Sequence, residues 1–281
     1  MLVSFSLCKQ TTSLLQKPPG ELKSNFFRPR LEKEMVVIIM GATGTGKSRL
    51  SIDLATRFPA EIINSDKIKA YAGLDITTNK IPEEERYGIS RQRILLTWLH
   101  IAMDSILAGG RVPIIVGGSN SYIEALVDDE DFQFRSRYEC CFLCVLVAMP
   151  VLHQYVSERV DKMVEMGMVD EESHCIGVPG FDRYFRAEPY LDKQQRGKLL
   201  QEAIQEIKRN TCKLACRQLE KIHRLRNKKN WKTHIVDATE VFGRRGKDAD
   251  EAWKKLVAGH STEIVAEFLY NFSPQTLVSG H

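Results

Sequence analysis

Residues 41–48 have the types and spacing needed to bind a polyphosphate. They read GATGTGKS and match the pattern G-x-x-x-x-G-K-[ST] at every fixed position. Glycines let the backbone form a nest of N–H groups around phosphate oxygens, the lysine neutralises charge, and the serine hydroxyl can bind Mg²⁺. The sequence therefore predicts a phosphate-binding loop and leaves its reaction open. Its residues are Gly41, Ala42, Thr43, Gly44, Thr45, Gly46, Lys47 and Ser48.

Two regular elements must position this loop. Residues 35–40 (MVVIIM) form a continuous apolar run, which is typical of a strand buried on both faces of a parallel sheet. Beyond the loop, Leu50, Leu54 and Phe58 recur at helical spacing, so the loop should open a helix. This context favours a P-loop over a structural glycine-rich turn.

Two further segments should end at the same edge of the sheet. Residues 61–67 (EIINSDK) predict a short strand that places Asp66 near the P-loop, because strand carboxyl ends face the ligand crevice. Asp66 could cap the next turn or accept a proton, and spacing alone does not decide. Residues 111–116 predict another strand, and Ser119 or Asn120 in the turn after it could cap a helix or face a ligand.

A strongly basic helix is expected near the C-terminus. Residues 208–232 contain ten Lys or Arg and one acid, Glu220. This face could be merely solvated, bind nucleic acid with steep salt dependence, or hold the phosphates of a nucleotide. Its basic face combines Lys213, Arg217, Lys221 and Arg224. Its apolar stripe is expected to contain Ile204, Ile207, Leu214, Ile222 and Leu225.

The composition is that of a globular protein without a membrane-spanning segment. The 281 residues are 43% hydrophobic and 27% charged, with a net charge of +4, so the chain can bury a core and its charge names no partner. No uncharged apolar stretch is long enough to span a bilayer, and no membrane partner is expected. Cys141 and Cys144 lie in an apolar run and should be buried strand cysteines rather than zinc ligands or a redox pair.

The motifs, taken together, resemble a known family. Residues 41–48, 63–67 (INSDK) and 71–80 (YAGLDITTNK) closely resemble the plant adenylate isopentenyltransferases, which are relatives of the tRNA dimethylallyltransferases. Further blocks follow in the same order, at residues 116–123, 157–164, 177–186 and 210–220. The fold class expected is α/β, a P-loop NTPase-like parallel sheet flanked by helices with a smaller helical C-terminal region.

The resemblance implies a reaction and a set of residues. A dimethylallyl group would pass from its diphosphate to N6 of AMP, ADP or ATP, the first step of cytokinin biosynthesis. The P-loop with Mg²⁺ would hold the diphosphate, Asp66 would be the general base, and Thr43 would lie between the leaving oxygen and the reaction centre. The substrate channel would include Ser65, Ser119 and Asn120, and phosphates would be bound by Lys213 and Arg217.

Some segments depart from the family pattern. A His-His-Leu turn is missing after Gly88, and the segments after Asp131 and Asp170 are shortened, so a catalytically impaired nucleotide-binding relative remains an alternative. A tRNA dimethylallyltransferase is a second alternative. It is disfavoured because no C-x-x-C…H finger follows Phe242 and little room is left for a tRNA-gripping insertion.

The expected organisation has four parts. Residues 1–34 are basic, rich in hydroxyls and poor in acids, which suits a transit peptide, although an extension without an address fits too. Residues 35–150 should form the P-loop core, 151–260 a helical region completing the substrate channel, and 261–281 a tail. A plastid location is expected, with mitochondrion and cytosol as alternatives, and the oligomeric state is left open.

Overall fold

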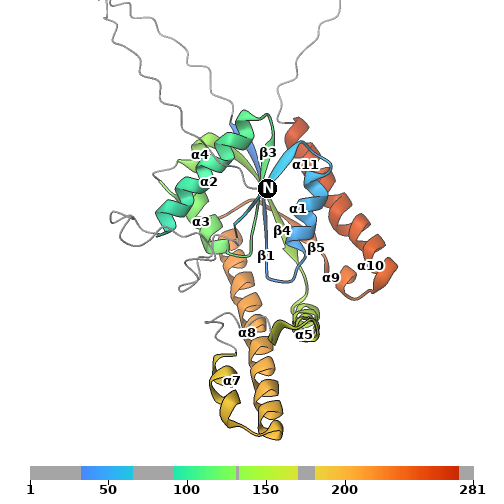
Figure 1. Cartoon of the computed structure of the whole chain (residues 1–281). Helices are drawn as coiled ribbons and strands as arrows, with labels where there is room; N and C mark the ends of the chain where they lie inside the picture. Colours follow the sequence, from blue (N-terminus) through green and yellow to red (C-terminus); the bar gives the residue numbers. More distant parts are fainter. Residues whose placement is uncertain (1–32, 66–90, 131–132, 170–180, 272–281) are drawn as a thin grey trace, which may run out of the picture. The chain divides into compact units, whose positions relative to one another are not determined.

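Five short strands form one parallel sheet (Figure 1). We used a computed structural model, which describes residues 33–65, 91–130, 133–169 and 181–271. All of these residues belong to one of the chain's two units, Lys33–His281. The strands have the spatial order β2-β3-β1-β4-β5. Their bounds are β1 Glu34–Gly41, β2 Ala60–Asn64, β3 Val112–Val116, β4 Tyr138–Leu146 and β5 Thr233–Asp237.

The position of β1 in the middle of the sheet explains why its sequence is apolar throughout. It pairs in parallel with β3 on one side and β4 on the other, with Ile38 opposite both Ile115 and Phe142. Side chains alternate between the faces of a strand, so Ile38 enters one hydrophobic cluster and Ile39 the other. Helices cover both faces, and a strand in that position has no solvent-facing side.

Different helices cover the two faces of the sheet (Figure 1). One face packs against α1 (Lys47–Ala55), the first turns of α5 (Met149–Glu165), the π-helical segment η3 (Trp253–Gly259) and α11 (His260–Asn271). The short helices α9 (Thr239–Phe242) and α10 (Gly246–Ala252) precede η3. The other face packs against α2 (Arg91–Ala108), α3 (Asn120–Asp128), α4 (Phe134–Arg137) and the end of α8 (Lys193–Asn227).

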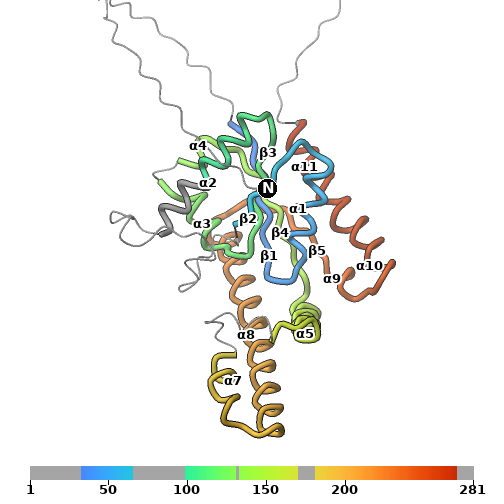
Figure 2. Tube along the Cα trace, viewed as in Figure 1, coloured from blue at the N-terminus to red at the C-terminus, as the bar shows by residue number. Residues whose placement is uncertain are grey.

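A separate helical cluster surrounds the first half of α8 (Figure 2). Asp192 and Gln195 form a capping box at the start of this 35-residue helix. The cluster includes Phe181, which is fully buried, and Ala203 of α8. The other helices involved are α5 and α7 (Asp182–Ala187), and the 3₁₀ turn η2 (Glu188–Tyr190) follows α7. The same helix α8 therefore carries this cluster at one end and the core of the sheet at the other.

The structure confirms the fold class expected from the sequence and corrects some details. The strands predicted around residues 35–40, 61–67 and 111–116 are present, and so is the strand expected to contain Cys141 and Cys144. Residues 151–260 were expected to be helical, but they also supply β5, which pairs with β4 in the sheet. Leu214, assigned to the apolar stripe of α8, is 39% exposed, because the buried face there is formed by Ala215 and Gln218.

The end of the chain also differs from the expected tail at 261–281. Residues up to Asn271 belong to α11, and Val265, Phe268 and Leu269 are buried against the sheet. These apolar residues recur at helical spacing, a signal that the sequence interpretation missed. Among the described residues, no helix is long and apolar enough to cross a membrane.

Candidate active site

The P-loop joins β1 to α1 in a conformation that only glycine accepts at two positions. Gly44 has φ 84° and Gly46 has φ 89°, both in the left-handed region. A Cβ on Gly46 would also lie 2.6 Å from the ring of Trp253. The predicted loop is therefore present, and a buried tryptophan from the C-terminal region supports it from outside.

Lys47 is directed back into the loop. It is 6% exposed, and its Nζ donates a hydrogen bond of 2.7 Å to the main-chain oxygen of Ala42. The same oxygen accepts a hydrogen bond of 3.0 Å from Thr45 Oγ1. Ser48, in the first turn of α1, is exposed. Mg²⁺ prefers oxygen ligands, and this accessible hydroxyl beside the lysine predicted to bind phosphate is a fitting one.

The carboxyl ends of β2 and β3 bring the predicted channel residues beside the P-loop. Ser65 is 2% exposed, and its hydroxyl donates to Val116 O at 3.1 Å. Ser119 takes the N-cap position of α3, and Asn120 is its first residue. The Asn120 side chain is 2% exposed, and its Oδ1 has no hydrogen-bond partner in the described part of the chain. Asp66 lies outside the described residues.

The helix α8 reaches this site from the C-terminal half of the chain. Gln218 accepts a hydrogen bond from the main-chain nitrogen of Thr43 at 2.6 Å. Arg217 and Lys213, the two predicted phosphate ligands, are exposed on the same helix. Arg217 is the residue next to this contact, and Lys213 lies one turn before it. Sequence reasoning missed Gln218 because no local pattern marks a residue whose partner lies so far away in the chain.

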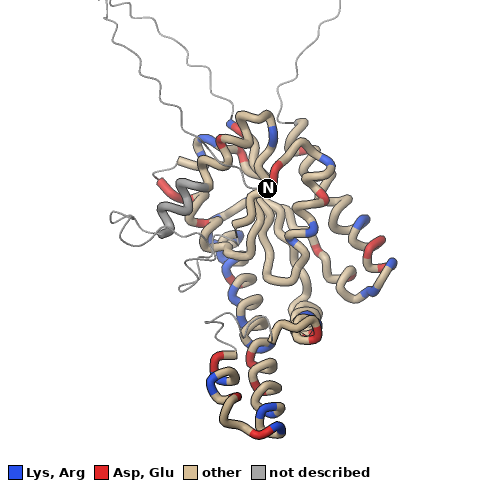
Figure 3. Tube along the Cα trace, viewed as in Figure 1, with Lys and Arg blue, Asp and Glu red and all other residues tan. Residues whose placement is uncertain are grey.

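The rest of the basic face of α8, Lys221 and Arg224, forms ion pairs within the chain. Figure 3 shows the basic residues along α8. Glu124 of α3, whose side chain is 13% exposed, forms ion pairs with Lys221 and Arg224, and with Lys229 at 2.9 Å. Burial alone would raise the pKa of Glu124, but hydrogen bonds from these three cations lower it to about 2. Lys229 also pairs with Asp128 at 2.7 Å. These cations fasten α8 to α3 and are therefore engaged within the chain.

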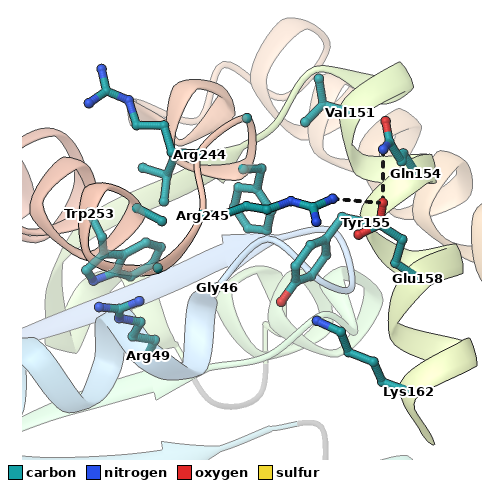
Figure 4. A pocket seen from close by; sticks show the side chains of 15 residues that line it. Gly46, Arg49, Val151, Gln154, Tyr155, Glu158, Lys162, Arg244, Arg245 and Trp253 are labelled. Carbon is teal, nitrogen blue, oxygen red and sulfur yellow. Dashed lines mark hydrogen bonds and ion pairs between the residues drawn. The ribbon is translucent and has the colours of Figure 1, made fainter. Parts of the chain in front are cut away.

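A cleft of about 680 Å³ opens on the other side of the P-loop, beside Gly46 (Figure 4). Its three arginines each contact an acid: Arg49 pairs with Asp250 at 2.8 Å, Arg245 with Glu158 at 3.9 Å, and Arg244 with Glu240. The positive charge of the cleft is thus largely compensated. The lining residues are Gly46, Arg49, Val151, Gln154, Tyr155, Glu158, Lys162, Val241, Phe242, Gly243, Arg244, Arg245, Gly246, Ala249 and Trp253.

Cys141 and Cys144 of β4 are buried, as expected. Burial raises the pKa of Cys141 to about 12 and that of Cys144 to about 11, so both thiols stay protonated at neutral pH. Across the described ranges, no group of three or more His, Cys, Asp or Glu side chains is placed to hold a metal ion.

Comparison with known proteins identifies the family. A family model described as isopentenyl transferase matches residues 34–174, and one described as IPP transferase matches residues 128–224. Adenylate isopentenyltransferase 3, chloroplastic, of Arabidopsis thaliana is 50% identical, and the match covers 97% of this chain and 92% of that protein. The chain belongs to the isopentenyl transferase family. This confirms the resemblance found in the sequence.

Other relatives in the isopentenyl transferase family agree. Adenylate isopentenyltransferase 7, mitochondrial, of the same plant is 44% identical over 96% of this chain and 91% of its own. The adenylate isopentenyltransferase of Humulus lupulus is 40% identical over 82% of this chain and 89% of its own. The relatives are thus similar along nearly their whole length, so the likeness extends well beyond the P-loop.

Solved structures show the same fold at low identity. A eukaryotic dimethylallyltransferase acting on tRNA superposes with a TM-score of 0.59 at 21% identity, covering 85% of this chain and 80% of that one. A tRNA isopentenylpyrophosphate transferase from Bacillus halodurans gives 0.54 at 22% identity, covering 84% and 98%. At these identities the likeness concerns the fold alone.

Proposed function

We propose that this isopentenyl transferase moves a dimethylallyl group from dimethylallyl diphosphate to N6 of an adenine nucleotide, the first step of cytokinin biosynthesis. The observation that carries the proposal is the extensive similarity to the adenylate isopentenyltransferases, combined with an intact P-loop at the carboxyl edge of the sheet. A prenyltransferase needs a cradle for the departing diphosphate, and this loop supplies the N–H groups and the lysine for it.

The reaction forms one bond and breaks another. The adenine N6 attacks C1 of the allyl group, the bond from C1 to the diphosphate oxygen breaks, and the diphosphate leaves with the bonding pair. Lys47 and the loop N–H groups stabilise the charge that develops on the diphosphate, and Mg²⁺ held by Ser48 would neutralise part of it. Thr43 is placed by its family position beside the leaving oxygen, and Asp66 accepts the proton lost from N6.

The acceptor in this proposal is a free nucleotide, not a tRNA. Lys213 and Arg217 remain exposed on α8 and are assigned to its phosphates. In contrast, Lys221 and Arg224 further along the helix, and Lys229 just beyond its end, are paired with Glu124. The buried Asn120 Oδ1, together with Ser65 and Ser119, lies at the edge where an adenine would enter. That oxygen is an acceptor available to an adenine donor.

Product formation tests the proposal directly. The full chain is incubated with dimethylallyl diphosphate, Mg²⁺ and, in parallel, AMP, ADP or ATP, and mass spectrometry detects the prenylated nucleotide. We expect product over many turnovers, and the three rates rank the acceptors. An anticodon stem-loop of tRNA is the comparison substrate. Intact nucleotide binding without product would favour the catalytically impaired alternative, and faster modification of the stem-loop would favour tRNA.

The assignment of Asp66 has its own test. Asp66→Ala removes the proposed proton acceptor, so kcat should fall by about 100-fold or more, within the range for general bases. Binding of inorganic diphosphate, measured by calorimetry, should be unchanged because the P-loop is intact. Turnover equal to that of the unaltered chain would remove Asp66 from the mechanism.

A plastid location is proposed for the same enzyme. The support comes from the basic, acid-poor composition of residues 1–34 and from relatives whose names include chloroplastic and, less often, mitochondrial. Fusing residues 1–34 to a fluorescent protein in plant cells should direct it into plastids. Replacing Lys9, Lys17 and Lys23 by Glu in that fusion should abolish import. Mitochondrial or cytosolic fluorescence of the original fusion would contradict the proposal.

A further inference from the structure

Gln218 joins the P-loop to the segment that leads from β3 into α3 at the proposed active site. Its Oε1 accepts from the main-chain nitrogen of Thr43 at 2.6 Å, and its Nε2 donates to Gly118 O at 2.9 Å. Its own main-chain oxygen accepts from Asn120 Nδ2 at 3.1 Å. One residue of α8 thereby connects the P-loop, the turn after β3 and the start of α3.

The surroundings leave the Gln218 amide a single orientation. The residue is 9% exposed, and its amide has an acceptor and a donor on opposite sides, each with one partner. Turning the amide over would place its oxygen against a carbonyl and its NH₂ group against an N–H. Gly118 is close to it, since a Cβ there would lie 2.7 Å from Gln218 Nε2 and 3.5 Å from Lys47 Nζ.

The hydrogen bond from the Thr43 N–H to Gln218 bears on the transfer reaction because it fixes the backbone of Thr43. This N–H points at Gln218, so Gln218 fixes the backbone from which the threonine side chain projects. The same amide holds Gly118, whose turn lies against the phosphate-binding lysine. Reactions of this kind depend on placement, and an error of about 1 Å can cost about 100-fold in rate.

We propose that Gln218 is a positioning residue of the transfer reaction, which sets Thr43 and the turn at Gly118 relative to each other. The inference rests on the proposed function, in which Thr43 acts beside the leaving oxygen. Gln218 acts through Thr43 and does not itself touch the substrate. A residue that only stabilised the fold would affect unfolding without changing kcat of the folded enzyme, and this difference is what the tests measure.

The first test replaces Gln218 by Met, which keeps the length of the side chain and removes both amide hydrogen bonds. In the full chain we expect kcat to fall by about 10- to 100-fold while KM for dimethylallyl diphosphate changes less than about 3-fold, because the phosphate nest is untouched. The matched control is Gln205→Met, an exposed position on the same helix, which should leave both constants unchanged. An unaltered kcat in Gln218→Met would overturn the proposal.

The second test uses Thr43→Ala, which removes the threonine hydroxyl and retains its main-chain N–H. If Gln218 acts through Thr43, adding Gln218→Met to this variant should lower kcat by less than about 3-fold, since the group being positioned is already gone. Losses that simply multiply would show that Gln218 acts independently of Thr43 and would overturn the proposal.

Gln218→Glu provides a reading that does not depend on how well the methionine variant folds. A protonated Glu has the shape of Gln, and its carbonyl can accept from Thr43 while its hydroxyl donates to Gly118. An ionised Glu has no proton to give to Gly118. The kcat of Gln218→Glu relative to the unaltered chain should therefore rise as pH falls from 8 toward 5, and a ratio independent of pH would contradict the proposal.

The outcomes separate this inference from the function on which it rests. If the unaltered chain forms no prenylated nucleotide, the proposed function fails and the positioning role fails with it. If the unaltered chain is active and the Gln218 variants are equally active, only the positioning role fails.

Discussion

The ammonium group of Lys47 is held inside the P-loop by a neighbouring main-chain oxygen. Its ammonium group is nearly buried and donates to the neutral main-chain oxygen of Ala42. An ionised phosphate oxygen attracts an ammonium group more strongly than a neutral carbonyl oxygen does, because both partners then carry a full charge. The ammonium therefore exchanges a weaker acceptor for a stronger one when a diphosphate binds, and it needs to move little to do so.

Replacing this lysine should affect catalysis far more than an equivalent change elsewhere. In Lys47→Met, kcat/KM for dimethylallyl diphosphate should fall by about 100- to 1,000-fold, because one charged donor to the departing diphosphate is lost. Lys198→Met, at an exposed position on α8, is the control and should be neutral. Steady-state kinetics with a saturating nucleotide check both. Equal activity of the two variants would show that the loop does not hold the diphosphate.

Several elements are held together by residues that are far apart in the sequence. Trp253, at the start of η3, packs against Gly46 of the P-loop and donates from Nε1 to Asp53 of α1 at 2.7 Å. Arg49 lies over its ring at 4.8 Å. The C-terminal helices thus support the wall of the loop opposite α8.

Removing the Trp253 ring should destabilise the protein. Trp253→Ala should lower the free energy of unfolding by about 3 to 5 kcal/mol through the cavity it leaves. Trp253→Phe keeps most of the packing and should cost about 1 to 3 kcal/mol through the unpaired Asp53. Urea titration followed by circular dichroism measures both, with Tyr190→Ala, at a residue 88% exposed, as the control. A neutral Trp253→Ala would mean that η3 does not support the loop.

The ion cluster between α3 and α8 should make stability depend on pH. The folded-state pKa of Glu124 is about 2, below its ordinary value of 4.5, so its stabilising effect is complete above about 4.5 and is lost as pH falls toward 2. Glu124→Gln should therefore cost on the order of 1 to 3 kcal/mol at pH 7 and much less near pH 3. Urea unfolding at both pH values, with exposed Glu206→Gln as the control, tests this. A cost equal at both pH values would contradict the assignment.

At the scale of the whole molecule, the sheet is completed by a strand from the far end of the chain. β5 pairs with β4 from Phe142↔Thr233 to Leu146↔Asp237, and the helices that follow it bury Val257 and Val265 against the sheet. The sheet and the helices after β5 consequently form one folding unit.

Truncation tests this dependence. A chain ending after residue 232 lacks β5, and it lacks η3 and α11, which with α1 and α5 cover one face of the sheet, so it should lose cooperative unfolding and become insoluble. A chain ending after residue 271 retains every described element and should unfold cooperatively like the full chain. Light scattering and thermal unfolding distinguish them. A soluble, cooperative chain ending after residue 232 would show that the sheet does not need β5.

The parts predictable from sequence were those whose signals are local. The P-loop was recognisable from eight consecutive residues, and β1, β3 and β4 from continuous apolar runs. The strand β5 was missed because it has five residues and only Val236 is buried, so little apolar signal remains. Gln218 and Glu124 were missed because their partners lie on distant segments, and no single segment indicates such a pair.

The late position of β5 has a consequence for synthesis. Roughly ninety residues separate the paired positions Phe142 and Thr233, so at about 5 to 20 residues per second the ribosome needs on the order of 5 to 20 s to supply the missing neighbour. During that interval the outer edge of β4 presents unpaired main-chain groups along an apolar segment. We expect nascent chains on neighbouring ribosomes to associate through this unpaired edge of β4. Chaperones should be most needed while α8 is being synthesised.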